Sequence, residues 1–428
     1  MTETKLEASA TRAIPDPDLD PSPEPHSLST VLLALVAGQV SLHSCMSGIR
    51  MAAPLQALKD GHGPGAVGVL IGLFALAAMI LALPAGKMAD RHGSRRPALV
   101  SIAMSFTGGL IAVLSQHYIA LCFAALLAGA AANVGMISMQ RSASRLATNP
   151  SQLRRVFGWL GLAPALSNFI GPFAAGFLID HAGFRGAFAA LSVLPLLGLV
   201  AVRYLPSESP ARAASPQADI ESGIPVPKTR TWELLASPQL RRLLFVNWLL
   251  SACWDVHGFV LPILGYQRGL SASAIGTILG LFAVSVGVVR VVLPMIADRF
   301  SESRILMTAM TLAGVVFSIY PFVHGAWGMG ACAVALGLVL GSSQPIIMST
   351  LHQITPEGRH GESIALRSMT LNMSSTAMPL LFGALGAAFG ASALFWLMGA
   401  GVFAGSWSAR NVDPAAKIQS PARSEADA

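Results

Sequence analysis

Twelve long apolar segments, separated by short polar stretches, are the feature that most restricts how this chain can fold. A helix that crosses the hydrocarbon core of a bilayer needs about 20 mainly apolar residues. Only 11% of the residues are charged, whereas soluble domains carry about 25%. The sequence therefore predicts an all-α polytopic membrane protein with twelve transmembrane helices. The predicted spans are 29–56, 65–85, 97–115, 118–139, 156–179, 186–204, 243–265, 274–296, 304–323, 327–349, 364–389 and 392–409.

Polar, proline-rich stretches divide the chain into segments. Residues 1–27 are predicted to be a disordered cytoplasmic tail, and residues 411–428 a second cytoplasmic tail. Residues 28–204 and 241–410 each hold six predicted spans and are expected to form two helical bundles. A cytoplasmic linker is expected between the bundles, over residues 205–240.

The distribution of lysine and arginine predicts the orientation in the membrane. Of the 28 basic residues, 22 lie on the side that holds both termini. Three lie in loops on the other side: Lys59, Arg185 and Arg268. Three lie inside predicted spans: Arg50, Arg290 and Arg367. Because loops rich in these residues stay in the cytoplasm, we expect both termini to be cytoplasmic and the protein to lie in an inner (plasma) membrane. This topology also explains the net charge of +7, so no nucleic-acid partner is expected.

The second half of the chain repeats the first at an offset of 208 residues. The segment 72–75 recurs as 280–283, and 89–91 recurs as 297–299. Pro172 matches Pro379 at an offset of 207. Two six-helix halves repeated in parallel are expected from this pattern.

A basic loop between the second and third spans carries a specific motif. Its sequence is GKMADRHGSRR, from Gly86 to Arg96. The glycines favour a tight turn, and Asp90 lies where we expect a helix to begin. The pattern resembles the signature loop of the major facilitator superfamily, which implies two six-helix bundles and a cytoplasmic gate. The gate residues that the resemblance implies are Gly86, Asp90, Arg91, Gly93, Arg95, Arg96 and, in the repeat, Asp298 and Arg299.

The fifth span resembles the motif that the antiporters of this superfamily carry there. The matching positions are Gly158, Gly171, Pro172 and Gly176. Ser167 stands where that motif usually has glycine, and Ala125 stands where the drug:proton antiporters have an arginine in the fourth span. The resemblance to the drug:proton antiporter branch is therefore loose.

Polar residues form matching stripes on the first and seventh spans. Gln39, His43, Ser47 and Arg50 fall within an arc of about 80° on one helix. Asn247, Ser251 and Asp255 occupy the equivalent offsets in the repeat. In the family that the chain resembles, helices one, four, seven and ten surround the central cavity. The residues expected to bind substrate there are Arg50, Gln39, His43, Ser47, Asn247, Ser251, Trp254, Asp255, Gln140 and Gln344. Hydrogen bonding between neighbouring helices is the alternative role for the uncharged members.

Charged groups inside spans are candidates for function because they are costly in lipid. Asp255 is the one carboxylate well inside a span, so we predict that it couples transport to protons. Arg50 is expected to bind an anionic group, or to pair with Asp255 when no substrate is bound. His257 points about 160° away from Asp255 on a helix, which favours a packing role. Arg290 suits close packing or a gate, and Arg367 either lines the cavity or extends to the membrane surface.

These features predict a secondary active transporter rather than an enzyme. It would move a small organic solute, anionic or zwitterionic, by alternating access. Proton coupling is the expected energy source, and uniport or exchange of substrate anions is the alternative. Lipid and the substrate are the expected partners, the chain is expected to be monomeric, and no cofactor or metal site is indicated. One alternative is a multidrug exporter for lipophilic cations, and another is a membrane sensor or receptor on the same fold.

Overall fold

The computed structural model of the protein describes residues 28–146, 150–204, 231–296, 301–356 and 359–410. Within these ranges all regular secondary structure is helical. The predicted tails, most of the predicted linker, and the gate residues Asp298 and Arg299 lie outside the described residues.

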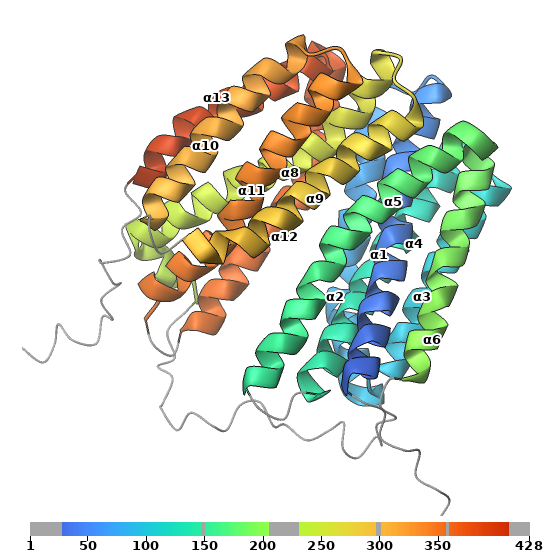
Figure 1. Cartoon of the computed structure of the whole chain (residues 1–428), viewed down its shortest axis with the longest axis horizontal. Helices are drawn as coiled ribbons and strands as arrows, with labels where there is room; N and C mark the ends of the chain where they lie inside the picture. Colours follow the sequence, from blue (N-terminus) through green and yellow to red (C-terminus); the bar gives the residue numbers. More distant parts are fainter. Residues whose placement is uncertain (1–27, 147–149, 205–230, 297–300, 357–358, 411–428) are drawn as a thin grey trace, which may run out of the picture.

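The first bundle contains six helical rods (Figure 1). Four of them are α1 (Leu28–Lys59), α2 (Pro64–His92), α3 (Arg95–Leu114) and α4 (Tyr118–Leu146). The other two are the arms of one continuous element, α5 (Pro150–Val193), which bends at Gly183. The second arm continues through η1 (Leu194–Leu197) and α6 (Gly198–Arg203).

The second bundle also contains six rods and begins after η2 (Thr231–Ala236). The side chain of Ser237 accepts a hydrogen bond from the amide of Leu240 and so caps the first of these helices. The helices are α8 (Pro238–Gln267), α9 (Ala272–Ile296), α10 (Glu302–Ile319) with η4 (Tyr320–Phe322), α11 (Ala326–Ile354), α12 (His360–Phe389) and α13 (Ala391–Arg410).

The backbone turns repeat between the two halves. Gly61 and Gly269 both have positive φ angles, of +85° and +69°, and they are 208 residues apart. Gly183 and Gly390 have φ angles of +70° and +85° and are 207 residues apart. Glycine adopts this conformation without the steric cost that a side chain brings. The bend inside α5 is therefore the equivalent of the break between α12 and α13.

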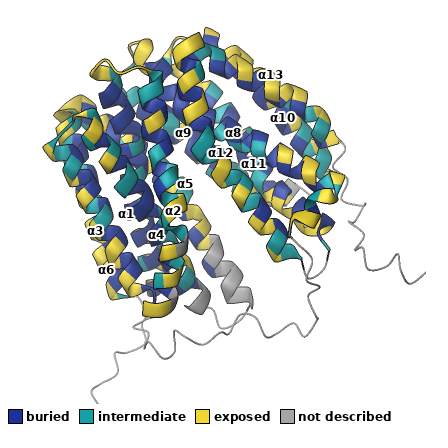
Figure 2. Ribbon diagram, turned by 180° about the vertical axis from the view of Figure 1, so that it is seen from behind, coloured by how far each residue is buried: buried dark blue, intermediate teal, exposed yellow. Residues whose placement is uncertain are grey.

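The outer faces of the helices are suited to lipid. Nine of the described segments are long and apolar enough to cross a membrane. Figure 2 shows buried residues on the inner faces of both bundles and exposed residues on their outer faces. The exposed residues include large apolar side chains, such as Trp327 at 95% and Met295 at 78% exposure. Apolar side chains this exposed are typical of a surface that lipid covers.

The two bundles meet at one end of the molecule and separate toward the other (Figure 1). We call the closed end, which holds the turns at Gly183 and Gly390, the loop end. The open end, where α1 begins at Leu28 and α13 ends at Arg410, is called the terminal end. Contacts between the bundles are made chiefly by α5 with α9 and by α2 with α12.

Both contacts between the bundles depend on glycine. A Cβ atom on Gly176 would overlap the carbonyl oxygen of Ala272, and one on Gly276 would overlap that of Pro172. In the other interface a Cβ atom on Gly68 would lie 2.5 Å from the carbonyl oxygen of Pro379. Side chains at these glycines would hold the helices apart, so the closed loop end requires glycine there.

The basic motif between α2 and α3 differs from its predicted structure. Helix α2 continues to His92, so Gly86 and the backbone of Asp90 lie inside the helix rather than in a loop. Gly93, with φ of +71°, makes the turn, and α3 begins at Arg95. The prediction that Asp90 stands at the start of a helix is wrong because α2 extends beyond its apolar stretch. Several other helices are also longer than their predicted spans, because their polar ends reach past the hydrocarbon region.

Candidate functional site

A cavity of about 80 Å³ lies between the bundles, at the junction of α1, α5, α8 and α9. Its polar lining consists of Ser47, Arg50, Asn168, Trp254 and His257. Met51, Leu279 and Phe282 contribute to its apolar lining. A bulk water molecule occupies about 30 Å³, and a protein cavity of about 150 Å³ holds benzene. A cavity of this volume therefore suits a small polar group of a few heavy atoms.

Arg50 brings a positive charge to this cavity from the middle of α1. The residue lies in the wall beside Ser47 and Met51. No described carboxylate forms an ion pair with it. A guanidinium group in lipid surroundings is stabilised by an anion that accepts its paired N–H donors, so the cavity offers the chemistry of a carboxylate or phosphate site.

Asp255 is held by α12 rather than by Arg50. Its side chain is buried, with 6% exposure. One carboxylate oxygen accepts a hydrogen bond of 2.9 Å from Ser374 Oγ, and the other accepts one of 3.5 Å from Ser375 Oγ. The expected ion pair with Arg50 is absent from the described contacts. Helix α12 therefore supplies the hydroxyl groups that donate hydrogen bonds to this carboxylate.

His257 lies in the cavity wall, although the helical wheel favoured a packing role. Its ring stacks on Phe282 of α9, with ring centroids 4.5 Å apart. The ring also meets the edge of Tyr320 at 6.0 Å. The cavity is on the histidine side of α8, so His257 both packs against Phe282 and lines the cavity.

Asn168 of α5 also lines the cavity and was missed. Only helices one, four, seven and ten were expected to contribute, whereas α5 crosses close to α1. A Cβ atom on Gly171 would overlap Ser47 Oγ, and Ser47 Oγ donates a hydrogen bond of 2.9 Å to the carbonyl oxygen of Ser167. A polar pair inside an apolar span, Ser167 with Asn168, is the sequence signal that could have identified this helix.

Other predicted substrate-binding residues are not part of the lining of this cavity. Gln39 and Asn247 are buried at 4% and 0% exposure, and they occupy equivalent positions in the repeat. The side-chain oxygen of Gln39 and both side-chain polar atoms of Asn247 have no partner among the described residues. His43, Ser251 and Gln140 are also outside the lining residues. Their roles in binding remain predictions.

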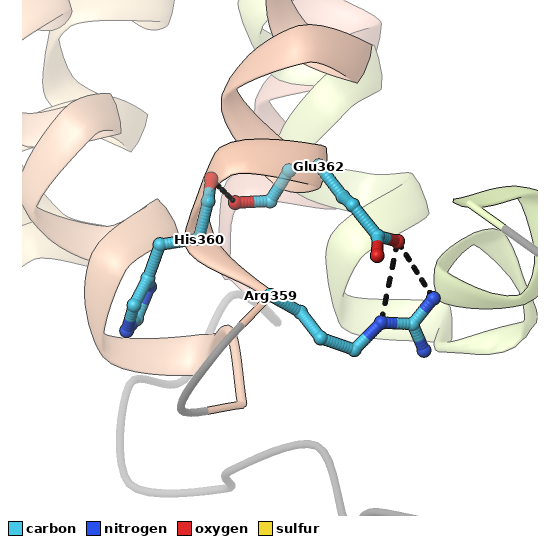
Figure 3. Close-up of polar contacts among 4 residues, drawn as sticks. Arg359, His360 and Glu362 are labelled. Carbon is cyan, nitrogen blue, oxygen red and sulfur yellow. Dashed lines mark hydrogen bonds and ion pairs between the residues drawn. The ribbon is translucent and has the colours of Figure 1, made fainter. Parts of the chain in front are cut away.

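The other arginines of the second bundle have distinct environments. Arg367 of α12 donates a hydrogen bond to the side-chain oxygen of Gln344 on α11, which ties the two helices together. Arg290 of α9 lies outside the cavity lining. At the start of α12, Arg359 pairs with Glu362 at 2.7 Å, and Ser363 Oγ donates to the carbonyl oxygen of His360 at 2.9 Å (Figure 3). These local contacts stabilise the terminal end of α12.

The antiporter-like motif of α5 contributes to the contacts of this helix with α1 and with α9. Gly171 allows α1 to approach, while Pro172 and Gly176 face α9 of the other bundle. Gly158 lies within the same helix. The motif therefore positions the cavity wall and the contact between the bundles together.

Two six-helix bundles that close around a polar site near the middle of the membrane define a transporter. The family model of the Major Facilitator Superfamily matches residues 35–271 and 243–427. The chain belongs to this superfamily and is a multi-pass membrane protein of the secondary-transporter kind.

Similar proteins are transporters of several kinds. The chain is 22% identical to the glucose transporter GlcP of Staphylococcus epidermidis, over 74% of this chain and 78% of that protein. It is 25% identical to the multidrug resistance protein MdtG of Citrobacter koseri, over 72% of this chain and 75% of that protein. A solved POT family transporter, in complex with a thioalcohol-conjugated peptide, matches with a TM-score of 0.71 and 14% identity over 88% of this chain and 94% of that one. These relatives support the fold and the class of transporter rather than a substrate.

Proposed function

We propose that the protein transports a small organic anion or zwitterion, and that Arg50 binds its anionic group. The observation that carries this proposal is the arginine in the cavity wall, which forms no direct ion pair with a described carboxylate. Leaving a buried guanidinium without a partner is costly. A substrate carboxylate would supply that partner with paired hydrogen bonds.

Proton coupling through Asp255 is the second part of the proposal. The carboxylate lies on α8, one residue from Trp254 in the cavity wall, and it is bonded to α12 of the same bundle. Protonation would weaken its acceptor contacts with the serines and free α12 to move. In this arrangement the proton site and the substrate site are neighbours but do not share one ion pair.

The membrane orientation follows from charge. The terminal end carries the basic motif Gly86–Arg96 and most of the lysine and arginine residues that the structure describes. Such an end faces the cytoplasm of an inner membrane. In this orientation the cavity is sealed from the outside by the loop end and opens inward.

The substitution Arg50→Lys tests the anion site. Lysine keeps the charge but loses the paired donors, so affinity for a carboxylate should fall at least tenfold, or ~1.4 kcal/mol. Thermal stabilisation of the purified protein by a panel of small carboxylates measures this. Arg290→Lys is the matched control, since Arg290 is another intramembrane arginine and lies outside the cavity lining. Equal affinity in Arg50→Lys and the parent would contradict the proposal.

Export of lipophilic cations is the competing function. Asp255 is an acid next to Trp254, whose ring face attracts cations, and one relative is a multidrug resistance protein. A cation such as tetraphenylphosphonium should bind Arg50→Ala as well as, or better than, the parent, whereas a carboxylate should bind it worse. The direction in which Arg50→Ala changes the affinity for each ligand therefore distinguishes anion transport from cation export.

A further inference from the structure

The cavity wall contains a second polar group that the anion site does not use, the imidazole of His257. Its exposure is 1%, and its ring is fixed between Phe282 and Tyr320. The Nε2 atom is enclosed and has no hydrogen-bond partner among the described residues. No contact within the described part of the chain involves the other ring nitrogen.

Stacking alone does not require a histidine at this position. A phenylalanine would keep the contact with Phe282 and would bring no polar atom into the membrane. A buried polar group without a partner costs free energy, and that cost is relieved when a bound molecule supplies the partner. A neutral imidazole offers one donor and one acceptor, so it recognises a hydroxyl or a carbonyl group equally well.

The two polar groups lie on opposite bundles of one small cavity. Arg50 and Asn168 belong to the first bundle, whereas Trp254 and His257 belong to the second. The cavity volume of about 80 Å³ is smaller than the cavity of about 150 Å³ that holds benzene. A ligand that contacts both bundles within this volume is therefore short.

We infer that the substrate is a short carboxylate with a second hydrogen-bonding group, a hydroxyl or oxo group, which His257 binds while Arg50 binds the carboxylate. This inference rests on the proposed anion site and extends it. The carbon atoms between the two groups lie against Trp254 and Phe282, whose rings meet edge to face at 4.8 Å. Because its two ends contact different bundles, such a molecule joins the halves around the site.

Matched pairs of acids test the inference. The probes are lactate with propionate, and 3-hydroxybutyrate with butyrate, each pair differing by one hydroxyl group. In the parent protein the hydroxylated member should bind about three- to tenfold more tightly, the range expected for one hydrogen bond. Binding is measured by thermal stabilisation of the purified protein and by counterflow in proteoliposomes.

The variant His257→Phe keeps the stacked ring and removes both nitrogens. The preference for the hydroxylated acid should disappear in this variant, while propionate and butyrate bind as they do to the parent. His257→Gln restores a polar side chain and should recover part of the preference. His181→Phe is the control, because the ring of His181 also stacks on a phenylalanine, Phe177, but lies outside the cavity lining, and this variant should keep the full preference.

The outcomes separate this inference from the anion site. A preference that survives in His257→Phe, or the absence of any preference in the parent, would overturn the role of His257. Failure of all four acids to bind would overturn the ligand class, while Arg50-dependent binding of another carboxylate would leave the proposed function standing. If His257→Phe binds none of the four acids although its thermal unfolding is unchanged, the histidine is needed for binding of the carboxylate as well. That result would also overturn the inference that His257 binds the hydroxyl or oxo group.

Discussion

Asp180 of α5 accepts a hydrogen bond of 2.8 Å from the backbone amide of Ser273, in the first turn of α9. Its other carboxylate oxygen accepts one of 3.1 Å from the amide of Ala272. The carboxylate thus caps a helix of the opposite bundle, where free N–H groups and the helix dipole favour a negative charge. The cap adds to the glycine contacts of Gly176 and Gly276 and holds the loop end closed.

The equivalent interface has no such cap. In the repeat, the position of Asp180 is taken by Ala387 at an offset of 207. Helix α2 begins with Pro64, which has no N–H group, and Gly63 provides no side-chain cap. Among the described residues, the α5–α9 contact at the loop end is stabilised by a charged helix cap as well as by packing, whereas the α2–α12 contact is stabilised by packing. We therefore expect α5 and α9 to control the opening of this end.

The substitution Asp180→Asn should favour the state that is open at the loop end. Asparagine keeps one acceptor oxygen but loses the charge, which is worth about 0.5–1 kcal/mol at an exposed helix N-terminus. The population ratio should change two- to fivefold. Distances between spin labels at the exposed positions Leu114 and Trp327, near the loop end, measure it.

Asp60→Asn is the control for the Asp180 substitution. Asp60 is another acid at the loop end, but its contact with Gln56 at 2.8 Å lies within the first bundle. The Asp60→Asn variant should leave the distances between the spin labels unchanged. Distances in Asp180→Asn that match those of the parent would show that the cap does not hold the end closed.

Replacement of Gly176 by alanine should disturb the same interface by crowding. The new methyl group would overlap the carbonyl oxygen of Ala272, whereas at Gly161 of the same helix a Cβ atom meets nothing within 4 Å. Gly176→Ala should shift the spin-label distances to longer values and slow transport, and Gly161→Ala should do neither. Normal closure in Gly176→Ala would mean that α9 moves to accommodate the methyl group.

Asp255→Asn should abolish uphill transport and spare counterflow. The amide still makes a hydrogen bond with Ser374 or Ser375 but cannot exchange a proton, and counterflow needs no net proton movement. Both activities are measured in proteoliposomes with an imposed pH gradient. If the variant still concentrates substrate against its gradient, the coupling proton is carried elsewhere.

Glu302 provides a stability prediction at the terminal end. Its carboxylate accepts hydrogen bonds from Ser349 Oγ at 2.6 Å, Thr350 Oγ1 at 2.7 Å and Gln353 Nε2 at 2.8 Å, and so joins α10 to α11. Glu302→Gln replaces one acceptor oxygen by a donor and should destabilise the protein by about 1–2 kcal/mol. Thermal unfolding should occur several degrees lower.

Glu362→Gln is the control for Glu302, because Glu362 pairs only with Arg359 near the start of the same helix. A pair of this kind, three residues apart at one end of a helix, contributes about 0.3–0.5 kcal/mol. An equal loss of thermal stability in the two variants would contradict the role of Glu302 between helices.

Much of the architecture could be predicted from the sequence because membrane helices obey local rules. Apolar length predicts each span, and the offset of 208 predicts two equivalent halves. The glycines that turn the chain recur at that offset. The basic motif predicted the family, although its helix boundary was wrong, because a helix can continue past its apolar stretch into water.

The site depended on tertiary structure. The sequence placed Arg50, Asp255 and His257 on known faces of their helices, since the helical period is independent of the neighbours. It could not show that Asp255 meets Ser374 of α12, that His257 shares a cavity with Arg50, or that Asp180 caps α9 across the bundle interface. Each of these contacts joins residues more than 90 positions apart, and it is set by how the helices cross and rotate against one another, which close packing at the glycines decides.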